Sequence, residues 1–285
     1  MFKKLIIIFL MLFLNSLCYG EESVKNHNRV NTCKNLLQKY TLEQLSSMIS
    51  SGNFDDIYVG DYIEMKMTSD YGTEKVRWLV ADIDYFYGKT DVPITDHHIV
   101  LLAEDCFKDL NRINSNNTTT GGFAGCEIYT TTLPKYDTAI INAFGASHIL
   151  SYHQLLTIAN NDTIPSMAGD NFSGASSNWG WADGAGTNPH ITTLMLMTDI
   201  QVSTKVISSS YFDTGINNSQ FSLFRELPEK ILCGRGFNAK IEKNNAYFLC
   251  VFVKSISSGL VSADGFFSFT NKNNNRGLRP YFLFK

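Results

Sequence analysis

The stretch Val76-Arg77-Trp78-Leu79-Val80-Ala81-Asp82-Ile83-Asp84 decides the fold class, because polar and apolar side chains alternate in it as in a β-strand. The preceding stretch Ile57–Met65 predicts a second strand, and the polar turn Ser69-Asp70-Tyr71-Gly72 joins the two. The stretch Ile99–Ala103 is entirely apolar, which indicates a central strand. The sequence therefore predicts a sheet that begins with these strands.

Two short helices are expected, one before these strands and one after them. Thr41-Leu42-Glu43-Gln44 has the pattern of a capping box, and apolar residues then recur at helical spacing until Gly52. Pro134 suits the first position of a second helix, where an N–H group would have no partner, and Gly145 ends that helix. The apolar faces consist of Leu42, Leu45, Met48 and Ile49 in the first helix and of Ala139, Ile140, Ala143 and Phe144 in the second.

The second half of the chain is predicted to be a long loop followed by short strands. Residues 160–190 are rich in Gly, Asn, Ser and Asp, and loops of that length are usually functional or disordered. Short strands are expected at Leu194–Val202, Tyr247–Val253, Leu260–Ala263, Phe266–Phe269 and Arg279–Phe284. We therefore expect one α+β domain over residues 55–285, with antiparallel sheets, preceded by a segment over residues 21–54 that carries the first helix.

The first twenty residues, 1–20, have the pattern of a secretory signal peptide. The basic start Met1–Lys4 is followed by the uncharged apolar run Leu5–Leu14. As a helix this run would rise about 15 Å, whereas a hydrocarbon core is about 30 Å thick, which disfavours a membrane anchor. Cleavage is expected after Gly20, giving a secreted, periplasmic or surface protein. The lipoprotein alternative would use Cys18, but Leu17 stands where such sites carry a small residue.

Composition and charge exclude several classes of protein. Hydrophobic residues make up 44% of the chain, which is typical of a globular domain and not of a disordered tail. The formal net charge is −3 and Lys and Arg are scattered, so no basic face for nucleic acid is visible. We expect no nucleic-acid partner, no stable membrane span after signal cleavage and no cofactor.

The cysteines permit a disulfide but do not define one. Of the six, Cys18 leaves with the signal peptide, and the odd number that remains cannot all pair within one chain. No two have CxxC spacing, so neither a zinc ribbon nor a thioredoxin motif is supported. Cys233 and Cys250 flank a predicted hairpin loop and are the best candidates for a bridge. Separate buried thiols are the alternative, and it stays equally open.

Several motifs near the C-terminus resemble the ending of an uncharacterised domain family of bacterial surface proteins and prophage tail proteins. They are Tyr247-Phe248-Leu249, Ser255-Ile256-Ser257, Val261-Ser262-Ala263-Asp264-Gly265 and Arg276-Gly277-Leu278-Arg279-Pro280-Tyr281-Phe282. Upstream motifs follow the order expected for that family, among them Gly60-Asp61-Tyr62, Tyr129–Pro134 and Phe212–Ile216. More loosely, the ending is similar to that of C-type-lectin-like and formylglycine-generating-enzyme folds. That similarity implies a buried closing strand and a binding face made of variable loops.

The chain departs from these families in two places. Cys250-Val251 stands where family members carry an arginine, which puts an arginine-dependent site in doubt. A formylglycine-generating activity would need a reactive cysteine pair, and Cys233 and Cys250 lie outside the corresponding motif context.

The main candidate site is a pair of tryptophans in the predicted long loop. Trp179 and Trp181 alternate around a glycine, so an extended backbone would place both indoles on one face, with Asp183 close by. Exposed indoles can hold a sugar ring or an apolar group of a partner, although both could instead tuck under the loop and anchor it. We expect a binding module that presents loops 111–132 and 160–190 to a glycan or a surface protein.

Three weaker patterns do not amount to a metal site. Asp96-His97-His98 with Asp82 and Asp84 could hold a metal, but adjacent strand histidines face opposite ways and no further ligand has diagnostic spacing. The spacing of His148 and His153 takes them off a shared helix face. Asp183-Gly184-Ala185-Gly186-Thr187-Asn188 faintly resembles a calcium loop but lacks alternating carboxylates.

No catalytic residue is predicted, because no Gly-x-Ser-x-Gly elbow is present and carboxylate pairs cannot be placed in space from sequence. The alternative to a binding module is a secreted enzyme, a hydrolase or a formylglycine-generating-type oxidase, whose site carries no recognisable motif.

Overall fold

The computed structural model describes residues 33–88, 94–116, 126–156, 180–183, 195–196, 220–227, 230, 248–254, 257–261, 267–271 and 275–285. Within these residues the chain forms helices and antiparallel sheets, which confirms the predicted α+β class. In the described part of the chain, no helix has the length and apolar character needed to cross a membrane.

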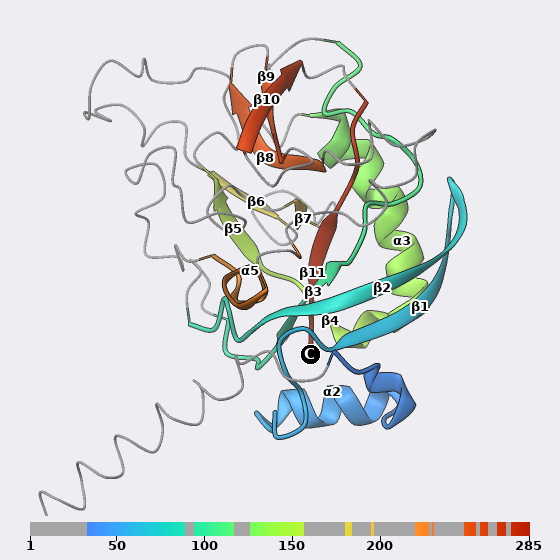
Figure 1. The fold of residues 1–285 in the computed structure, drawn as a ribbon, viewed down its shortest axis with the longest axis vertical. Helices are drawn as coiled ribbons and strands as arrows, with labels where there is room; N and C mark the ends of the chain where they lie inside the picture. The colour runs from blue at the N-terminus through green and yellow to red at the C-terminus, as the bar shows by residue number, and fades with distance from the viewer. Residues whose placement is uncertain are drawn as a thin grey trace, which may run out of the picture.

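A six-stranded antiparallel sheet forms the centre of the described structure (Figure 1). Its strands are β1 (Tyr62–Ser69), β2 (Gly72–Ile83), β3 (Ile99–Ala103), β11 (Pro280–Phe284), β4 (Ile149–Leu150) and β7 (Met195–Leu196). β11 lies between β3 and β4, and its first residues also pair with β7. All five residues of β3 are buried, which confirms the predicted central strand.

The hairpin of β1 and β2 starts later than predicted, at Tyr62 instead of Ile57. The buried Asp61 carboxylate accepts the backbone N–H groups of Tyr58 and Lys34, at 3.1 and 3.0 Å. These bonds hold the residues before β1 in a turn and attach the first described residues to the sheet. A carboxylate with local backbone donors competes with strand pairing, which is why the apolar pattern alone placed the strand start too early.

The first helix, α2 (Leu42–Ser50), begins with the predicted capping box. The Gln44 N–H donates to Thr41 Oγ1 at 3.2 Å, and the Thr41 N–H donates back to Gln44 Oε1 at 2.9 Å. α2 buries Leu45 and Ile49, and a short 3₁₀ turn, η1 (Leu36–Gln38), precedes it. Figure 1 shows α2 below the sheet, next to the C-terminus.

The second helix, α3 (Leu133–Phe144), is preceded by a helical turn that the sequence did not predict. Residues Ile128–Thr132 form a π-helical turn, η2, which runs directly into α3. Pro134 has no N–H, and its ring would crowd the carbonyl one turn earlier in an α-helix. In the π turn, the Leu133 N–H donates to the Ile128 carbonyl, five residues earlier. Gly145, at φ +84°, ends α3 as predicted.

The core lies between α3 and the sheet, with Trp78 of β2 at its centre. The buried indole contacts Phe107, Phe144 and Phe282 edge to face, with ring centroids 6.0, 6.2 and 5.0 Å apart. α3 packs against β1 and buries Leu133, Tyr136, Asp137, Ala139, Ile140 and Phe144. The polar face of α3 is therefore directed away from the core, toward the surface of the protein.

The closing strand β11 is part of the core, as the resemblance to C-type-lectin-like folds implied. Leu278, Tyr281 and Phe282 are fully buried, and so is Arg279. The Arg279 guanidinium donates from Nε to the Ala103 carbonyl at 2.8 Å and from Nη2 to the Lys230 carbonyl at 2.9 Å. Arg279 is thus paired within the fold.

Two smaller sheets and one short helix complete the described elements. The three-stranded sheet has the order β10 (Phe267–Asn271), β9 (Ser257–Val261), β8 (Phe248–Lys254), and β5 (His153–Leu156) pairs with β6 (Gly180–Asp183). A three-residue 3₁₀ turn, η3 (Ala146–His148), leads into β4, and α5 (Ser222–Glu226) packs against β2. β6 lies inside residues 160–190, so this part of the predicted loop is instead a strand.

Candidate functional site

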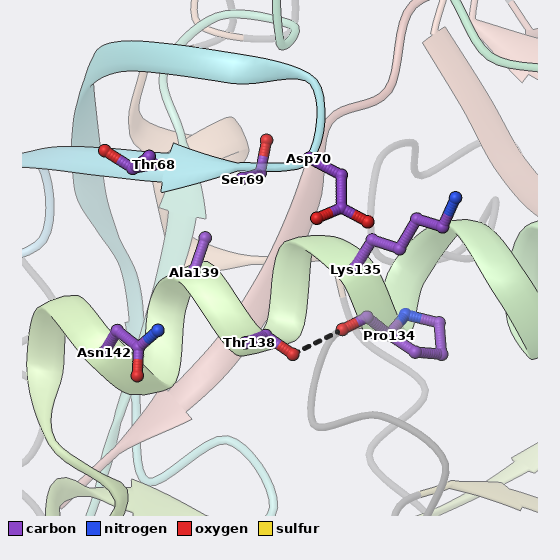
Figure 2. A pocket seen from close by; sticks show the side chains of 8 residues that line it. All are labelled: Thr68, Ser69, Asp70, Pro134, Lys135, Thr138, Ala139 and Asn142. Atoms are coloured by element: carbon purple, nitrogen blue, oxygen red, sulfur yellow. Dashed lines mark hydrogen bonds between the residues drawn. The ribbon is translucent and has the colours of Figure 1, made fainter.

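An open groove of about 440 Å³ lies between the tip of the β1–β2 hairpin and the exposed face of α3 (Figure 2). Its volume falls in the range of roughly 300–1,000 Å³ that small-molecule sites occupy. Unlike most such sites, it is lined largely by hydroxyl, amide and charged side chains. The lining residues are Thr68, Ser69, Asp70, Pro134, Lys135, Thr138, Ala139 and Asn142.

The hairpin wall of the groove has a fixed shape because its tight turn is hydrogen-bonded. Ser69 and Gly72 pair with each other, which leaves Asp70 and Tyr71 as the two connecting residues. The Tyr71 N–H donates to Ser69 Oγ at 3.1 Å, and Gly72 has φ +114°, a conformation that glycine adopts readily. The turn places the Asp70 carboxylate toward α3 (Figure 2).

The helix wall presents polar groups because the apolar side of α3 is turned to the core. Lys135, Thr138 and Asn142 are exposed and recur at intervals of three and four residues, so they share one face. Thr138 Oγ1 donates to the Pro134 carbonyl at 3.1 Å, which leaves the hydroxyl lone pairs available as acceptors. Ala139 adds only a methyl group and keeps the groove open between the two walls.

An aromatic stack supports the charged end of the groove. The Tyr71 ring, 38% exposed, stacks on the buried Tyr136 ring at 4.9 Å between centroids and 18° between planes. The Lys135 ammonium lies 5.5 Å from the centroid of the Tyr71 ring, within the range of a cation–π interaction. Tyr136 thereby positions Tyr71, and Tyr71 in turn positions Lys135.

The charged groups at this end are not paired with each other. Among the described residues, neither Asp70 nor Lys135 takes part in a salt bridge within 4.0 Å. Asp70 offers acceptors, Lys135 offers donors, and the Asn142 amide offers both. Such a set can bind a polar ligand by hydrogen bonds from several directions.

The histidines that the sequence marked as metal candidates form a structural cluster. Asp84, at φ +52°, places its carboxylate 2.6 Å from His97 Nδ1 and accepts the His98 N–H at 2.9 Å. The buried His98 ring accepts the Phe86 N–H at Nε2, 3.2 Å away, so its proton is on Nδ1, which donates to the Asp96 carbonyl. Burial lowers the pKa of His98, in keeping with a neutral ring.

The remaining ligand candidates do not join this cluster. The Asp82 carboxylate points elsewhere and accepts the N–H groups of Ser222 and Ile83. On the far side of the His97 ring, a Cβ placed on Gly52 would lie 2.9 Å from Nε2, so backbone occupies the space. No group of three metal-ligating side chains occurs in the described residues. His97 and His98 therefore connect β2, β3 and the end of α2.

The predicted binding residues are only partly placed. Trp181 and Asp183 lie in β6, opposite Leu155 and His153, with only their backbone described, and Trp179 lies outside the described residues. Of the predicted disulfide, Cys250 lies in β8 and Cys233 lies outside the described residues. Cys33 is exposed, which differs from the alternative in which all the thiols are buried, whereas Cys106 and Cys126 are buried. The tryptophan platform and the disulfide stay predictions.

The groove was missed because each of its walls looked like ordinary structure in the sequence. Ser69–Gly72 was interpreted only as a turn, and the residues after Pro134 only through their apolar face. The signal that the sequence does carry is the polar face of that helix, formed by Lys135, Thr138 and Asn142, but the contact between this helix and the turn is visible only in the structure. Comparison of the chain with family models, curated proteins and solved structures found no match.

Proposed function

We propose that this protein is an exported binding module that holds a glycan in the groove between the β1–β2 turn and α3. The observation that carries the proposal is the concentration of uncommitted polar side chains around one concave surface. Asp70, Lys135 and Asn142 are all exposed, and all three border the same groove. Elsewhere exposed polar groups are common, but here they converge from two rigid elements.

Sugars match this chemistry better than apolar ligands do. Each sugar hydroxyl is both a donor and an acceptor, so it can donate to Asp70 or Thr138 and accept from Lys135 or Asn142. The groove is open, which suits one unit of a longer chain that continues into solvent. A site that preferred apolar molecules would bury apolar and aromatic side chains in its lining.

Export and the finer fold assignment belong to the same proposal. The basic and apolar pattern of residues 1–20 supports secretion, and the intact mass of the mature protein should correspond to a chain that starts at Glu21. The buried closing strand β11 supports a C-type-lectin-like arrangement. A surface protein is a second class of partner, and Trp179 and Trp181 are the residues that would favour it.

The test is a glycan array followed by calorimetric titration of the ligands that bind. Thr138→Val removes a hydroxyl at nearly constant shape, and Asn142→Ala removes an amide from an exposed helix position. We expect each variant to weaken binding at least about fivefold, roughly the effect of one lost hydrogen bond. Their melting temperatures should stay close to that of the parent protein.

Two controls make the result specific to the groove. Thr131→Val changes an exposed threonine outside the groove lining and should leave glycan affinity unchanged. The double variant Trp179→Ala/Trp181→Ala tests the competing platform. Binding that is lost in the tryptophan variant and retained in both groove variants would show that the groove is not the site.

A further inference from the structure

The groove has a charged end and an uncharged end, and this asymmetry restricts the ligand. Figure 2 shows Asp70 and Lys135 together at one end, with Thr68 and Asn142 at the other. Thr68 Oγ1 lies 3.0 Å from Thr73 Oγ1 across the hairpin, and one of the two hydroxyl groups donates to the other. The uncharged end therefore offers hydroxyl and amide groups, which suit ring hydroxyls of a sugar.

The charged end disfavours ligands that carry a net charge. An anionic group attracted by Lys135 would also meet the carboxylate of Asp70, and a cationic group attracted by Asp70 would meet the ammonium of Lys135. Both charged groups are exposed, so water and salt screen them to a similar extent. Neither the Asp70 carboxylate nor the Lys135 ammonium therefore determines the electrostatic potential at this end of the groove alone. The two formal charges sum to zero, so a neutral ligand group is favoured there.

An amide is the neutral group whose polarity fits this end. A trans amide directs its N–H and its C=O to opposite sides, so it can donate to a carboxylate while it accepts from an ammonium. Both of these hydrogen bonds would be charge-assisted, which makes them stronger than bonds between neutral groups. A sugar hydroxyl donates and accepts at a single oxygen atom. At the same place it would form a good hydrogen bond with one of the two residues and a poorer one with the other.

We propose that the groove selects a glycan unit that bears an N-acyl group, such as an N-acetylated amino sugar, with its amide between Asp70 and Lys135. The proposal rests on the proposed glycan-binding function and adds the class of sugar. Tyr71 acts as a positioning residue, because its ring holds the Lys135 ammonium at this end of the groove.

Calorimetric titration with three tetrasaccharides of the same β-1,4 linkage tests the proposal. They are the tetramer of N-acetylglucosamine, the tetramer of glucose and the tetramer of glucosamine, which is cationic. We expect the N-acetylated tetramer to bind at least about tenfold more tightly than either of the others. Equal affinity for the glucose tetramer would overturn the N-acyl proposal and leave the glycan-binding function intact. Failure of all three tetramers, with another glycan bound on the array, would overturn the N-acyl proposal alone. If no glycan binds at all, both proposals fail.

Two double variants separate hydrogen bonding from charge. Asp70→Asn/Lys135→Gln removes both charges but keeps an acceptor and a donor, so the two hydrogen bonds are no longer charge-assisted and affinity for the N-acetylated tetramer should fall, with a preference over the glucose tetramer of at least about threefold retained. Asp70→Leu/Lys135→Met removes both partners and should reduce the preference for the N-acetylated tetramer over the glucose tetramer to about one. The matched control is Asp55→Asn/Lys66→Gln, two exposed charged residues outside the groove lining. A loss of binding in the first variant as large as in the second would mean that the ligand is recognised by charge, and the proposal would be wrong.

Discussion

The buried carboxylate of Asp82 accepts the backbone N–H of Ser222 at 2.8 Å, and so connects β2 to α5 across 140 residues of sequence. Its other oxygen accepts the Ile83 N–H at 2.9 Å. On the side of α5, Arg225 Nη2 donates to Ser222 Oγ at 2.6 Å. This polar connection holds α5 in place, a helix that is too short to be stable alone.

Removal of the Asp82 carboxylate should destabilise the protein strongly. In Asp82→Ala, two buried N–H groups lose their acceptor, and each unsatisfied group costs about 1–3 kcal/mol. We expect the free energy of unfolding, measured with urea, to fall by about 2–4 kcal/mol in total. Asp55→Ala, which removes an exposed carboxylate, should change it by less than about 0.5 kcal/mol. A loss below about 1 kcal/mol in Asp82→Ala would show that water or other donors replace these bonds.

Asp82 should also give stability an unusual pH dependence. Burial raises the pKa of Asp82, although the hydrogen bonds from Ser222 and Ile83 act against it. The folded state therefore holds this proton more tightly than the unfolded state does, where the pKa is about 3.9. The stabilising contribution is present below that value and is lost as pH rises through the raised folded pKa. The stability of the parent protein minus that of Asp82→Asn should decrease as pH rises from about 3.5. A difference that is constant or increases would contradict the raised pKa.

His98 should have the opposite effect on acidification. Burial is the largest cause of its lowered pKa, so the folded state binds this proton less tightly than the unfolded state. Its contribution to stability is present above about pH 6.5 and is lost as pH falls from there through the lower folded pKa. In His98→Gln the amide oxygen can still accept the Phe86 N–H, but the side chain at this position no longer takes up a proton. Urea unfolding at pH 8 and pH 5 should show a smaller acid loss in this variant than in the parent protein.

Sequence patterns such as capping boxes and turn residues predicted those elements whose signals are contained in a few neighbouring residues. The capping box of α2, the turn at Ser69–Gly72 and the end of α3 at Gly145 all depend on such signals, and all are confirmed. The start of β1 was wrong because Asp61 takes its partners from Tyr58 and from Lys34, which is distant in sequence. Tertiary hydrogen bonds of this kind leave no periodic pattern.

The candidate site was harder to predict than the fold for a related reason. The groove exists because a two-residue turn lies over the polar face of a helix more than sixty positions later, and no spacing in the sequence encodes that contact. The burial of Arg279 was predictable only from resemblance to other chains. A guanidinium in a strand is ordinarily expected at the surface.

Arg279 should be essential for the attachment of β11 to its neighbours. In Arg279→Met, the carbonyls of Ala103 and Lys230 lose their donors while the buried volume is roughly kept. We expect the free energy of unfolding to fall by about 2–4 kcal/mol. The free energy of unfolding of Arg279→Lys should lie between those of the parent protein and Arg279→Met, because an ammonium lacks the planar fork that reaches both carbonyls. If Lys and Met are equally destabilising, the loss comes from packing and not from these hydrogen bonds.

Gly52 allows a comparison that isolates one contact of the histidine cluster. Its φ of +72° is close to the φ of +69° at Gly88, so an alanine at either position should suffer a similar backbone strain of about 1–2 kcal/mol. At Gly52 the new Cβ would also lie 2.9 Å from His97 Nε2, whereas nothing lies within 4 Å of a Cβ at Gly88.

The His97 ring cannot easily move away from such a Cβ, because Asp84 holds its Nδ1 and the rings of Tyr87 and Phe54 contact it. We therefore expect Gly52→Ala to destabilise the protein by about 1 kcal/mol more than Gly88→Ala, in line with overpacking at a well-packed position. Thermal and urea unfolding of both variants measure this difference. In a Gly52→Ala/His97→Ala double variant the clash is absent, so the extra loss should disappear once the effect of His97→Ala alone is subtracted. If the extra loss persists, it arises from the backbone at Gly52 and not from the histidine.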